Sequence, residues 1–157
     1  MNLKNYIRSI KDYPKKGILF RDITTLIKDK DAFAETINQI VERSKNFEFD
    51  KIAAIESRGF VFASAVSYIL KKPFIMLRKK NKLPADVHSI DFELEYGTAT
   101  IEVHKDSINE KDEVLIIDDL IATGGTAEAA AKLVEISKGK VAAFVFVINL
   151  FDLGGSD

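Results

Sequence analysis

The chain has 157 residues, and its 23 lysines and arginines against 24 aspartates and glutamates give a formal net charge of −1 at pH 7. This length predicts one domain that can bury a hydrophobic core without cross-links. The near-neutral charge provides no long-range attraction for nucleic acid, and the absence of cysteine excludes disulfides, zinc-finger sites and cysteine nucleophiles. Because no apolar run is suited to a signal peptide or a membrane span, we expect a cytoplasmic protein with no membrane partner.

Strands alternate with helices along the sequence, which predicts a parallel sheet covered by helices on both faces. The helical spacing of Leu3, Tyr6, Ile7 and Ile10 predicts a short first helix. Asp31 is a candidate cap for the helix that follows. The further elements that we expect are a strand at 51–55, a helix at 60–70, strands at 73–77 and 114–117, a helix at 125–137 with Gly139 at its C′ position, and a central strand at 141–148.

The stretch between residue 78 and about residue 89 breaks this alternation. It is charged, contains Pro84 and lacks apolar periodicity, so it predicts a mobile loop. On either side of Gly97, apolar and polar residues alternate from Phe92 to Tyr96 and from Thr98 to His104. This pattern predicts an antiparallel hairpin with one solvated face.

The most informative segment is VLIIDDLIATGGT at 114–126. Four apolar residues predict a buried strand, which delivers Asp118 and Asp119 to the edge of the sheet where open α/β proteins bind ligands. The following glycines allow a backbone to approach an anion closely, and the helix after them presents its positive end. The arrangement suits a sugar phosphate, and it matches neither the GxxxxGKS/T loop of nucleotide hydrolases nor the dinucleotide-binding GxGxxG.

This segment resembles the 5-phosphoribosyl-1-pyrophosphate (PRPP) motif of the type I phosphoribosyltransferases. GILFRDIT at 17–24 and LEYG at 94–97 resemble the adenine branch of that family, and further matching segments are ESRGF at 56–60, RKKNKLP at 78–84 and INLFDLGG at 148–155. The resemblance implies one domain over 1–157, with a central parallel sheet flanked by helices. It also implies a small hood at about 1–25, a core at about 31–157 and a flexible loop at about 78–97.

The activity implied by the resemblance is transfer of the 5-phosphoribosyl group from PRPP to adenine, giving AMP and pyrophosphate in purine salvage. Asp118 and Asp119 would hold the ribose hydroxyls, with Mg²⁺ bound mainly through PRPP and possible contacts from both carboxylates. The residues that would cradle the 5′-phosphate are Ala122, Thr123, Gly124, Gly125 and Thr126. Those that would face pyrophosphate are Ser57, Arg58, Gly59, Arg78 and Lys82.

The acceptor side of the site is also implied by the resemblance. Phe20 and Leu120 would sandwich the purine ring, and the backbone near Leu19 would read its edge, with Arg21 and Arg58 close by. Glu95 would accept or relay the proton that the purine nitrogen loses. The same resemblance implies a homodimer. One departure is Asn81, which occupies a position where the family commonly has glycine.

The residues alone leave other interpretations open. Phe20 could be core packing, Arg58 could be a surface arginine at a helix start, and Glu93 and Glu95 could both be solvated residues on a hairpin. For the whole chain, the alternatives are transfer to hypoxanthine, guanine or xanthine, and a PRPP-sensing regulator that has lost catalysis. Base discrimination depends on a few hydrogen bonds, many of them from the backbone, which a sequence does not display.

Overall fold

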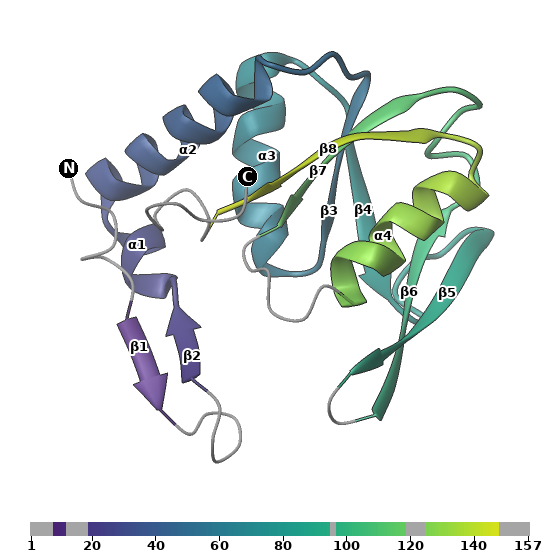
Figure 1. Ribbon diagram of the computed structural model, residues 1–157, viewed down its shortest axis with the longest axis horizontal. Coiled ribbons are helices and arrows are strands. Elements are labelled where there is room, and N and C mark those ends of the chain that lie inside the picture. Colours follow the sequence, from purple (N-terminus) through teal and green to yellow (C-terminus); the bar gives the residue numbers. More distant parts are fainter. Residues whose placement is uncertain (1–7, 12–18, 95–96, 119–124, 148–157) are drawn as a thin grey trace.

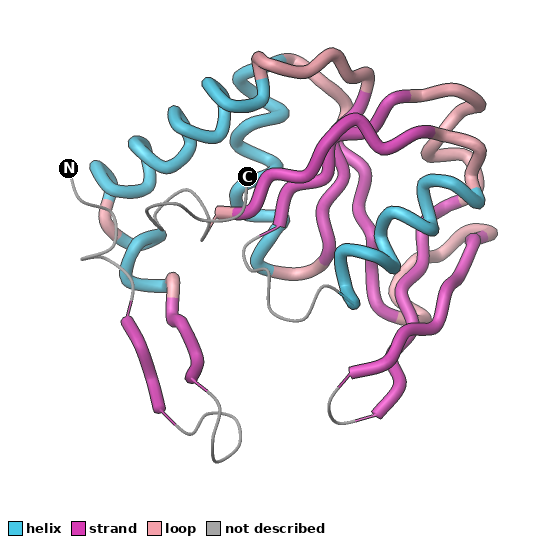
Figure 2. Tube along the Cα trace, in the orientation of Figure 1, coloured by secondary structure: helices cyan, strands magenta, loops and turns pink. Residues whose placement is uncertain are grey.

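A computed structural model describes residues 8–11, 19–94, 97–118 and 125–147 of the chain. Figure 1 shows its elements in sequence colours, and Figure 2 shows helices lying on either side of the strands. The strands are β1 (Arg8–Lys11), β2 (Leu19–Asp22), β3 (Lys51–Ile55), β4 (Phe74–Lys79), β5 (Val87–Leu94), β6 (Gly97–His104), β7 (Glu113–Asp118) and β8 (Lys140–Phe146). The helices are α1 (Thr24–Lys28), α2 (Lys30–Ser44), α3 (Arg58–Leu70) and α4 (Gly125–Ile136).

The main sheet has the strand order β5-β6-β4-β3-β7-β8. The pairs β4–β3, β3–β7 and β7–β8 are parallel, whereas β6 runs antiparallel to both β4 and β5. The predicted α/β class, the parallel centre and the antiparallel hairpin are therefore confirmed. Within the described residues β8 pairs with β7 alone, so the prediction that 141–148 forms a central strand is wrong. Most of its side chains are only half-buried, as expected at a sheet edge.

Two hydrophobic cores fill the two sides of this sheet. Alternate residues of β3 explain the division, because Ile52 and Ala54 pack on the side of α2 and α3, whereas Ala53 and Ile55 pack on the side of α4. The strands buried on both faces are accordingly almost wholly apolar. None of the described helices is long and apolar enough to cross a membrane.

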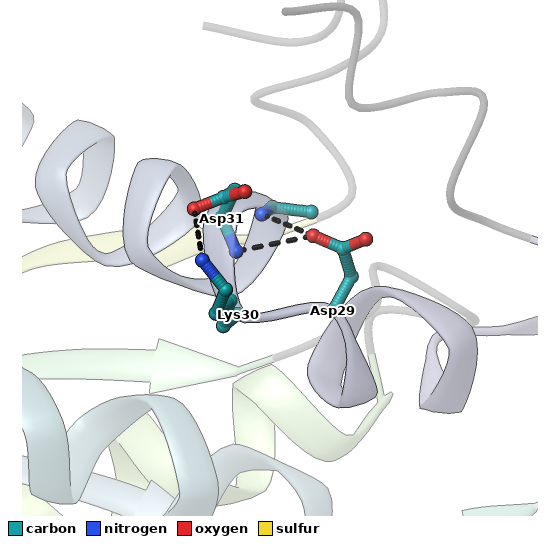
Figure 3. Close-up of polar contacts among 4 residues, drawn as sticks. Asp29, Lys30 and Asp31 are labelled. Carbon is teal, nitrogen blue, oxygen red and sulfur yellow. Dashed lines mark hydrogen bonds and ion pairs between the residues drawn. The ribbon is translucent and has the colours of Figure 1, made fainter.

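The start of α2 is fixed by Asp29 rather than by the predicted cap, Asp31. Figure 3 shows one Asp29 carboxylate oxygen accepting hydrogen bonds from the backbone N–H groups of Asp31, at 3.1 Å, and Ala32, at 2.9 Å. Asp31 lies in the first turn, where its charge suits the positive end of the helix, and it contacts Lys30. Asp29 and Asp31 lie two positions apart and are equally good cap residues by type, so the sequence alone could not decide between them.

The end of α4 corrects a second expectation. The backbone N–H of Gly139 donates to the Val134 carbonyl and that of Lys138 donates to the Glu135 carbonyl, which together form a Schellman motif. The left-handed C′ residue is Lys138, with φ of 71°, and Gly139 follows it at C″. Glycine is required at 139 by space instead, since a Cβ there would lie 2.8 Å from Ile108 Cγ2.

Two further expectations change near the hairpins. Residues 8–11 form β1, antiparallel to β2, instead of the last turn of the predicted first helix; residues 1–7 lie outside the described part. Within the expected loop at 78–97, β4 continues to Lys79 and β5 begins at Val87. The pairing of β5 with β6 therefore takes in residues 87–89, the end of the segment whose lack of apolar periodicity had suggested a loop, while residues 80–86 lie between the strands.

A polar clamp joins the amino ends of β3 and β7. Lys51 Nζ lies 2.7 Å from Asp112 Oδ2 and also donates to the Ser107 carbonyl. The Asn109 backbone N–H donates to the same Asp112 oxygen at 2.7 Å. Partial burial of this carboxyl opposes its ionisation, but the hydrogen bonds and charge of its partners outweigh that effect, so the pKa of Asp112 lies below its usual range.

Replacing Asp112 with Asn should reduce the free energy of unfolding at neutral pH by about 1–2 kcal/mol, because the charge-assisted bond to Lys51 is lost. A lowered folded-state pKa gives stability above the unfolded-state pKa, which is lost as pH falls through the folded-state value. Urea unfolding should therefore show the difference from wild type shrinking below about pH 4. The exposed Asp106→Asn provides the control, and equal losses in both variants would contradict a specific clamp.

Candidate active site

The candidate site lies at the carboxyl ends of β3, β4 and β7. Figure 1 shows α3 and α4 beginning at this end of the sheet, with the β1–β2 and β5–β6 hairpins projecting beyond it on opposite sides. Because neighbouring parallel strands end at one edge, residues that follow β3 and β7 are brought together although about 60 positions separate them in the chain. This is the edge to which the sequence assigned the ligand.

Gly59, which follows β3, lies against the end of β7. It lies in the first turn of α3, and a Cβ there would stand 3.2 Å from the Ile117 carbonyl oxygen and 3.5 Å from Asp118 Oδ1. Asp118 is only 9% exposed, and its carbonyl accepts a hydrogen bond from the Val147 backbone N–H at 2.9 Å. The predicted pyrophosphate loop at 57–59 therefore lies directly against the predicted ribose-binding strand end.

Glu56, which sequence reasoning missed, ties β3 to β4. Its backbone N–H donates to the Leu77 carbonyl at 3.0 Å. Its carboxylate Oε1 accepts hydrogen bonds from Arg78 Nε at 3.1 Å and from the Lys79 backbone N–H at 2.7 Å. The sequence signal that could have identified Glu56 is its position as a charged residue directly after the buried strand at 51–55. Arg78 is thereby held at the same edge as Ser57, Arg58 and Gly59.

Electrostatics keep Glu56 ionised. Burial of the carboxyl opposes its ionisation, but the Lys79 backbone N–H and the Arg78 guanidinium more than compensate, so the pKa of Glu56 lies below its usual range. The ion pair is partly shielded, since the Arg78 side chain is 32% exposed and that of Glu56 is 11% exposed. The carboxylate thus orients one cation and leaves the rest of that guanidinium available to an anion.

Lys82 lies at the end of a tight turn that follows β4. The turn is closed by its backbone N–H, which donates to the Lys79 carbonyl at 3.3 Å. The third turn residue, Asn81, has φ of 67°, a left-handed conformation in which glycine is favoured and asparagine is tolerated. The Lys82 side chain is exposed. The departure from glycine at 81 is therefore compatible with the turn's backbone.

The structure describes some of the predicted site residues and omits others. Among those described, Ser57, Arg58 and Gly59 follow β3, Arg78 and Lys82 flank the turn after β4, Asp118 ends β7, and Gly125 and Thr126 begin α4. Leu19, Phe20 and Arg21 are placed as backbone in β2. Glu95, Asp119, Leu120, Ala122, Thr123 and Gly124 lie outside the described residues. No group of three or more histidine, cysteine, aspartate or glutamate side chains suited to a metal ion occurs in the described part.

Replacing Gly59 with Ala tests the close contact between the strand ends. The new methyl group would press on a main-chain oxygen of a buried strand, so we expect a loss of about 1–2 kcal/mol in unfolding free energy. We also expect PRPP binding, measured by calorimetry, to weaken about tenfold as the loop is displaced from Asp118. Ser64→Ala, at an exposed position of the same helix, is the control. Wild-type PRPP affinity in Gly59→Ala would contradict the assigned geometry.

Comparison with known proteins places this chain in a family. Residues 23–151 match the family model described as a phosphoribosyl transferase domain. An adenine phosphoribosyltransferase of Pelagibacter ubique strain HTCC1062 is 85% identical over 157 residues, covering 100% of this chain and 90% of the relative. Another, of Methylobacillus flagellatus, is 53% identical over 155 residues, covering 99% of this chain and 88% of the relative.

Solved structures agree with these sequence relatives. The crystal structure of adenine phosphoribosyltransferase from Thermoanaerobacter pseudethanolicus has a TM-score of 0.89 at 48% identity, covering 92% of this chain and 84% of that one. The Saccharomyces cerevisiae enzyme, crystallised with an imino-altritol bisphosphate and adenine, has a TM-score of 0.85 at 33% identity, covering 92% and 84%. The chain belongs to the phosphoribosyltransferase family, because the family model matches most of it and relatives match its whole length at up to 85% identity.

Proposed function

We propose that the protein transfers the 5-phosphoribosyl group of PRPP to adenine, producing AMP and pyrophosphate. The full-length relative at 85% identity, itself an adenine phosphoribosyltransferase, is the observation that carries this conclusion. The geometry supports it, because the Asp118 carboxylate, the 57–59 loop and the basic turn after β4 share one sheet edge. A hydroxyl-rich sugar that carries a 5′-phosphate and a 1-pyrophosphate requires acceptors and cations placed in this way.

The reaction breaks the bond between the anomeric carbon and pyrophosphate and forms a bond from that carbon to a purine nitrogen. The transition state resembles that of glycoside cleavage, with positive charge on the ribosyl ring. We assign Asp118 and Asp119 to the ribose hydroxyls and Ala122 to Thr126 to the 5′-phosphate. Arg58, Arg78 and Lys82 would stabilise the negative charge that accumulates on the departing pyrophosphate.

Mg²⁺ suits the donors at this edge. It prefers oxygen ligands and commonly binds through one or two carboxylates together with substrate phosphates. Asp118 offers a carboxylate there, and the described residues supply no larger acidic cluster, so most of the ligands would come from PRPP. When bound, the metal would neutralise part of the leaving group's charge. Asp118 and Asp119 would orient the ribose at the same time.

On the acceptor side, β2 would contribute Leu19, Phe20 and Arg21, and Leu120 would cover the opposite face of the purine. Glu95, which lies between β5 and β6 in the sequence, would accept or relay the proton released when the purine nitrogen attacks. A carboxylate within hydrogen-bond reach of that nitrogen is the chemical requirement. These assignments rest on the resemblance between motifs and on the placement of both hairpins beside the sheet edge (Figure 1).

Replacing Glu95 with Gln should lower kcat by about 100-fold, because an amide cannot accept the proton. The KM for PRPP should change little, since the donor is bound by other residues. Glu93→Gln is a matched control two positions away on the exposed side of β5, where Glu93 lies opposite Thr98. Steady-state assays with both substrates decide the role: a raised KM at unchanged kcat would indicate binding instead of proton transfer.

The second proposal is a homodimer that buries the outer face of α3. Val61, Tyr68 and Ile69 are 38%, 84% and 48% exposed, and their spacing places them on one side of the helix. Met76, 43% exposed, lies in β4 opposite Ala54, on the sheet face that α3 covers. Apolar side chains gathered in this way favour association with a second apolar surface.

Tyr68→Glu should therefore shift the protein toward the monomer in sedimentation velocity, because a charge would be buried at the interface. Ile136→Glu is the control, since Ile136 is 46% exposed but belongs to α4. A monomer–dimer equilibrium that is unchanged by Tyr68→Glu would eliminate this surface.

Base preference is settled by turnover assays with adenine, hypoxanthine, guanine and xanthine, each with PRPP and Mg²⁺. Guanine use without adenine use would overturn the proposed acceptor. Binding of PRPP without any nucleotide product would favour the regulator. The cytoplasmic location stays a prediction, which cell fractionation would test.

A further inference from the structure

Glu102 is a buried carboxylate to which neither the motifs nor the reaction gives a role. It lies in β6 between Ile101 and Val103, which pack into the core beneath α4. Because strand side chains alternate, Glu102 faces the opposite side of the sheet, yet it is only 7% exposed. A carboxylate that far from water requires compensating hydrogen bonds.

Both oxygens of Glu102 are occupied by neutral donors. Oε1 accepts the backbone N–H of Asn81 at 3.0 Å, and Oε2 accepts the Ser89 hydroxyl at 2.8 Å. In the sheet, Glu102 lies opposite Ser89 of β5 on one side and opposite Arg78 of β4 on the other. In the described part of the chain no lysine or arginine lies within ion-pair distance of this carboxylate.

The contact with Asn81 falls on the turn that carries Lys82. Asn81 is the left-handed residue of that turn, and its N–H is the group that Glu102 fixes. Glu56 fixes the Lys79 N–H at the start of the same turn. Two carboxylates, that of Glu102 in β6 and that of Glu56 after β3, therefore hold the main chain of residues 79–81 through its N–H groups.

Fold stability alone gives weak grounds for this arrangement. Two neutral hydrogen-bond donors recover only part of the free energy that a carboxylate loses when it leaves water. An apolar residue at this position would fit a strand equally well. We propose that Glu102 is a positioning residue, which holds the 79–82 turn in the conformation that presents Lys82, together with Arg78, to the pyrophosphate of PRPP. The inference rests on the proposed pyrophosphate-binding role of Lys82.

The role is geometric, so an uncharged residue of the same shape should perform it. In Glu102→Gln, the amide oxygen can accept the Asn81 N–H while the amide nitrogen donates to the Ser89 oxygen. In Glu102→Leu, both contacts are lost at similar volume. Ser89→Ala removes one contact and provides a milder variant if Glu102→Leu does not fold.

The experiment compares these variants with wild type and with Asp91→Ala. Asp91 accepts the Thr100 hydroxyl at 2.6 Å on the exposed part of the same hairpin, so its loss controls for damage to the β5–β6 pair. We expect Glu102→Leu to raise the KM for PRPP about tenfold and Ser89→Ala about threefold, with the KM for adenine unchanged. Glu102→Gln and Asp91→Ala should remain within about twofold of wild type.

Hydrogen exchange of the peptide covering 80–86 supplies the second measurement. It should become faster in Glu102→Leu and Ser89→Ala but not in Glu102→Gln. Unchanged exchange in this peptide, or equal rises in the KM for both substrates, would overturn the inference.

Lys82→Ala separates this inference from the role on which it rests. If Lys82→Ala raises the KM for PRPP and Glu102→Leu does not, the positioning role alone is wrong. If Lys82→Ala leaves that KM unchanged, the pyrophosphate-binding role fails and the inference fails with it.

Discussion

The parallel pairing of β3 with β7 is the constraint on which the rest of the site depends. Its register sets Ala54 opposite Ile117, so both strands finish at the same level and their following residues must share one small space. Gly59 fits there because it has no side chain; a Cβ at this position would press against the Ile117 carbonyl oxygen and the Asp118 carboxylate. Any larger residue would have to separate the strands or tilt α3. The edge proposed to bind phosphate is therefore a consequence of backbone pairing, and its side chains refine it.

Acidic residues organise the basic part of this site. Glu56 holds Arg78 and the Lys79 N–H, and Glu102 holds the Asn81 N–H. Without such anchors, a run of four cations within five residues would repel itself and lose conformational entropy on binding a polyanion. Carboxylates that bind backbone N–H groups fix the main chain and leave the lysine side chains exposed. The main chain of the turn is thus held in place while the side chains of Lys79, Lys80 and Lys82 are exposed, as the proposed pyrophosphate-binding role of Lys82 requires.

Periodicity predicted the parallel sheet, the helix after β3, the hairpin around Gly97 and the placement of Asp118, because each depends on local apolar patterns. It failed where the outcome depends on contacts between distant segments. The glycine at 139 is required by Ile108 and Asp112, which no local rule identifies. An unbroken apolar run could not distinguish the edge strand β8 from a central one, since helices cover both faces. Glu102 looked like one polar member of an alternating strand, and only the turn folded over it shows its burial.

The contacts that stabilise β3 and β7 and the residues proposed to bind substrate lie at opposite ends of these strands. The Lys51–Asp112 clamp and the 109–113 turn close the amino ends of β3 and β7, whereas the groups that would meet PRPP lie past their carboxyl ends. The acceptor base would be read from β2 and the β5–β6 hairpin, which project beyond the doubly covered core (Figure 1). Changes near the acceptor base on those hairpins would alter which base is accepted, whereas Glu102 and Ser89 of the β5–β6 hairpin would act on the turn that carries Lys82. The proposed ribose contacts thus follow the core strands, whereas the proposed purine contacts come from the hairpins together with Leu120 of the core motif.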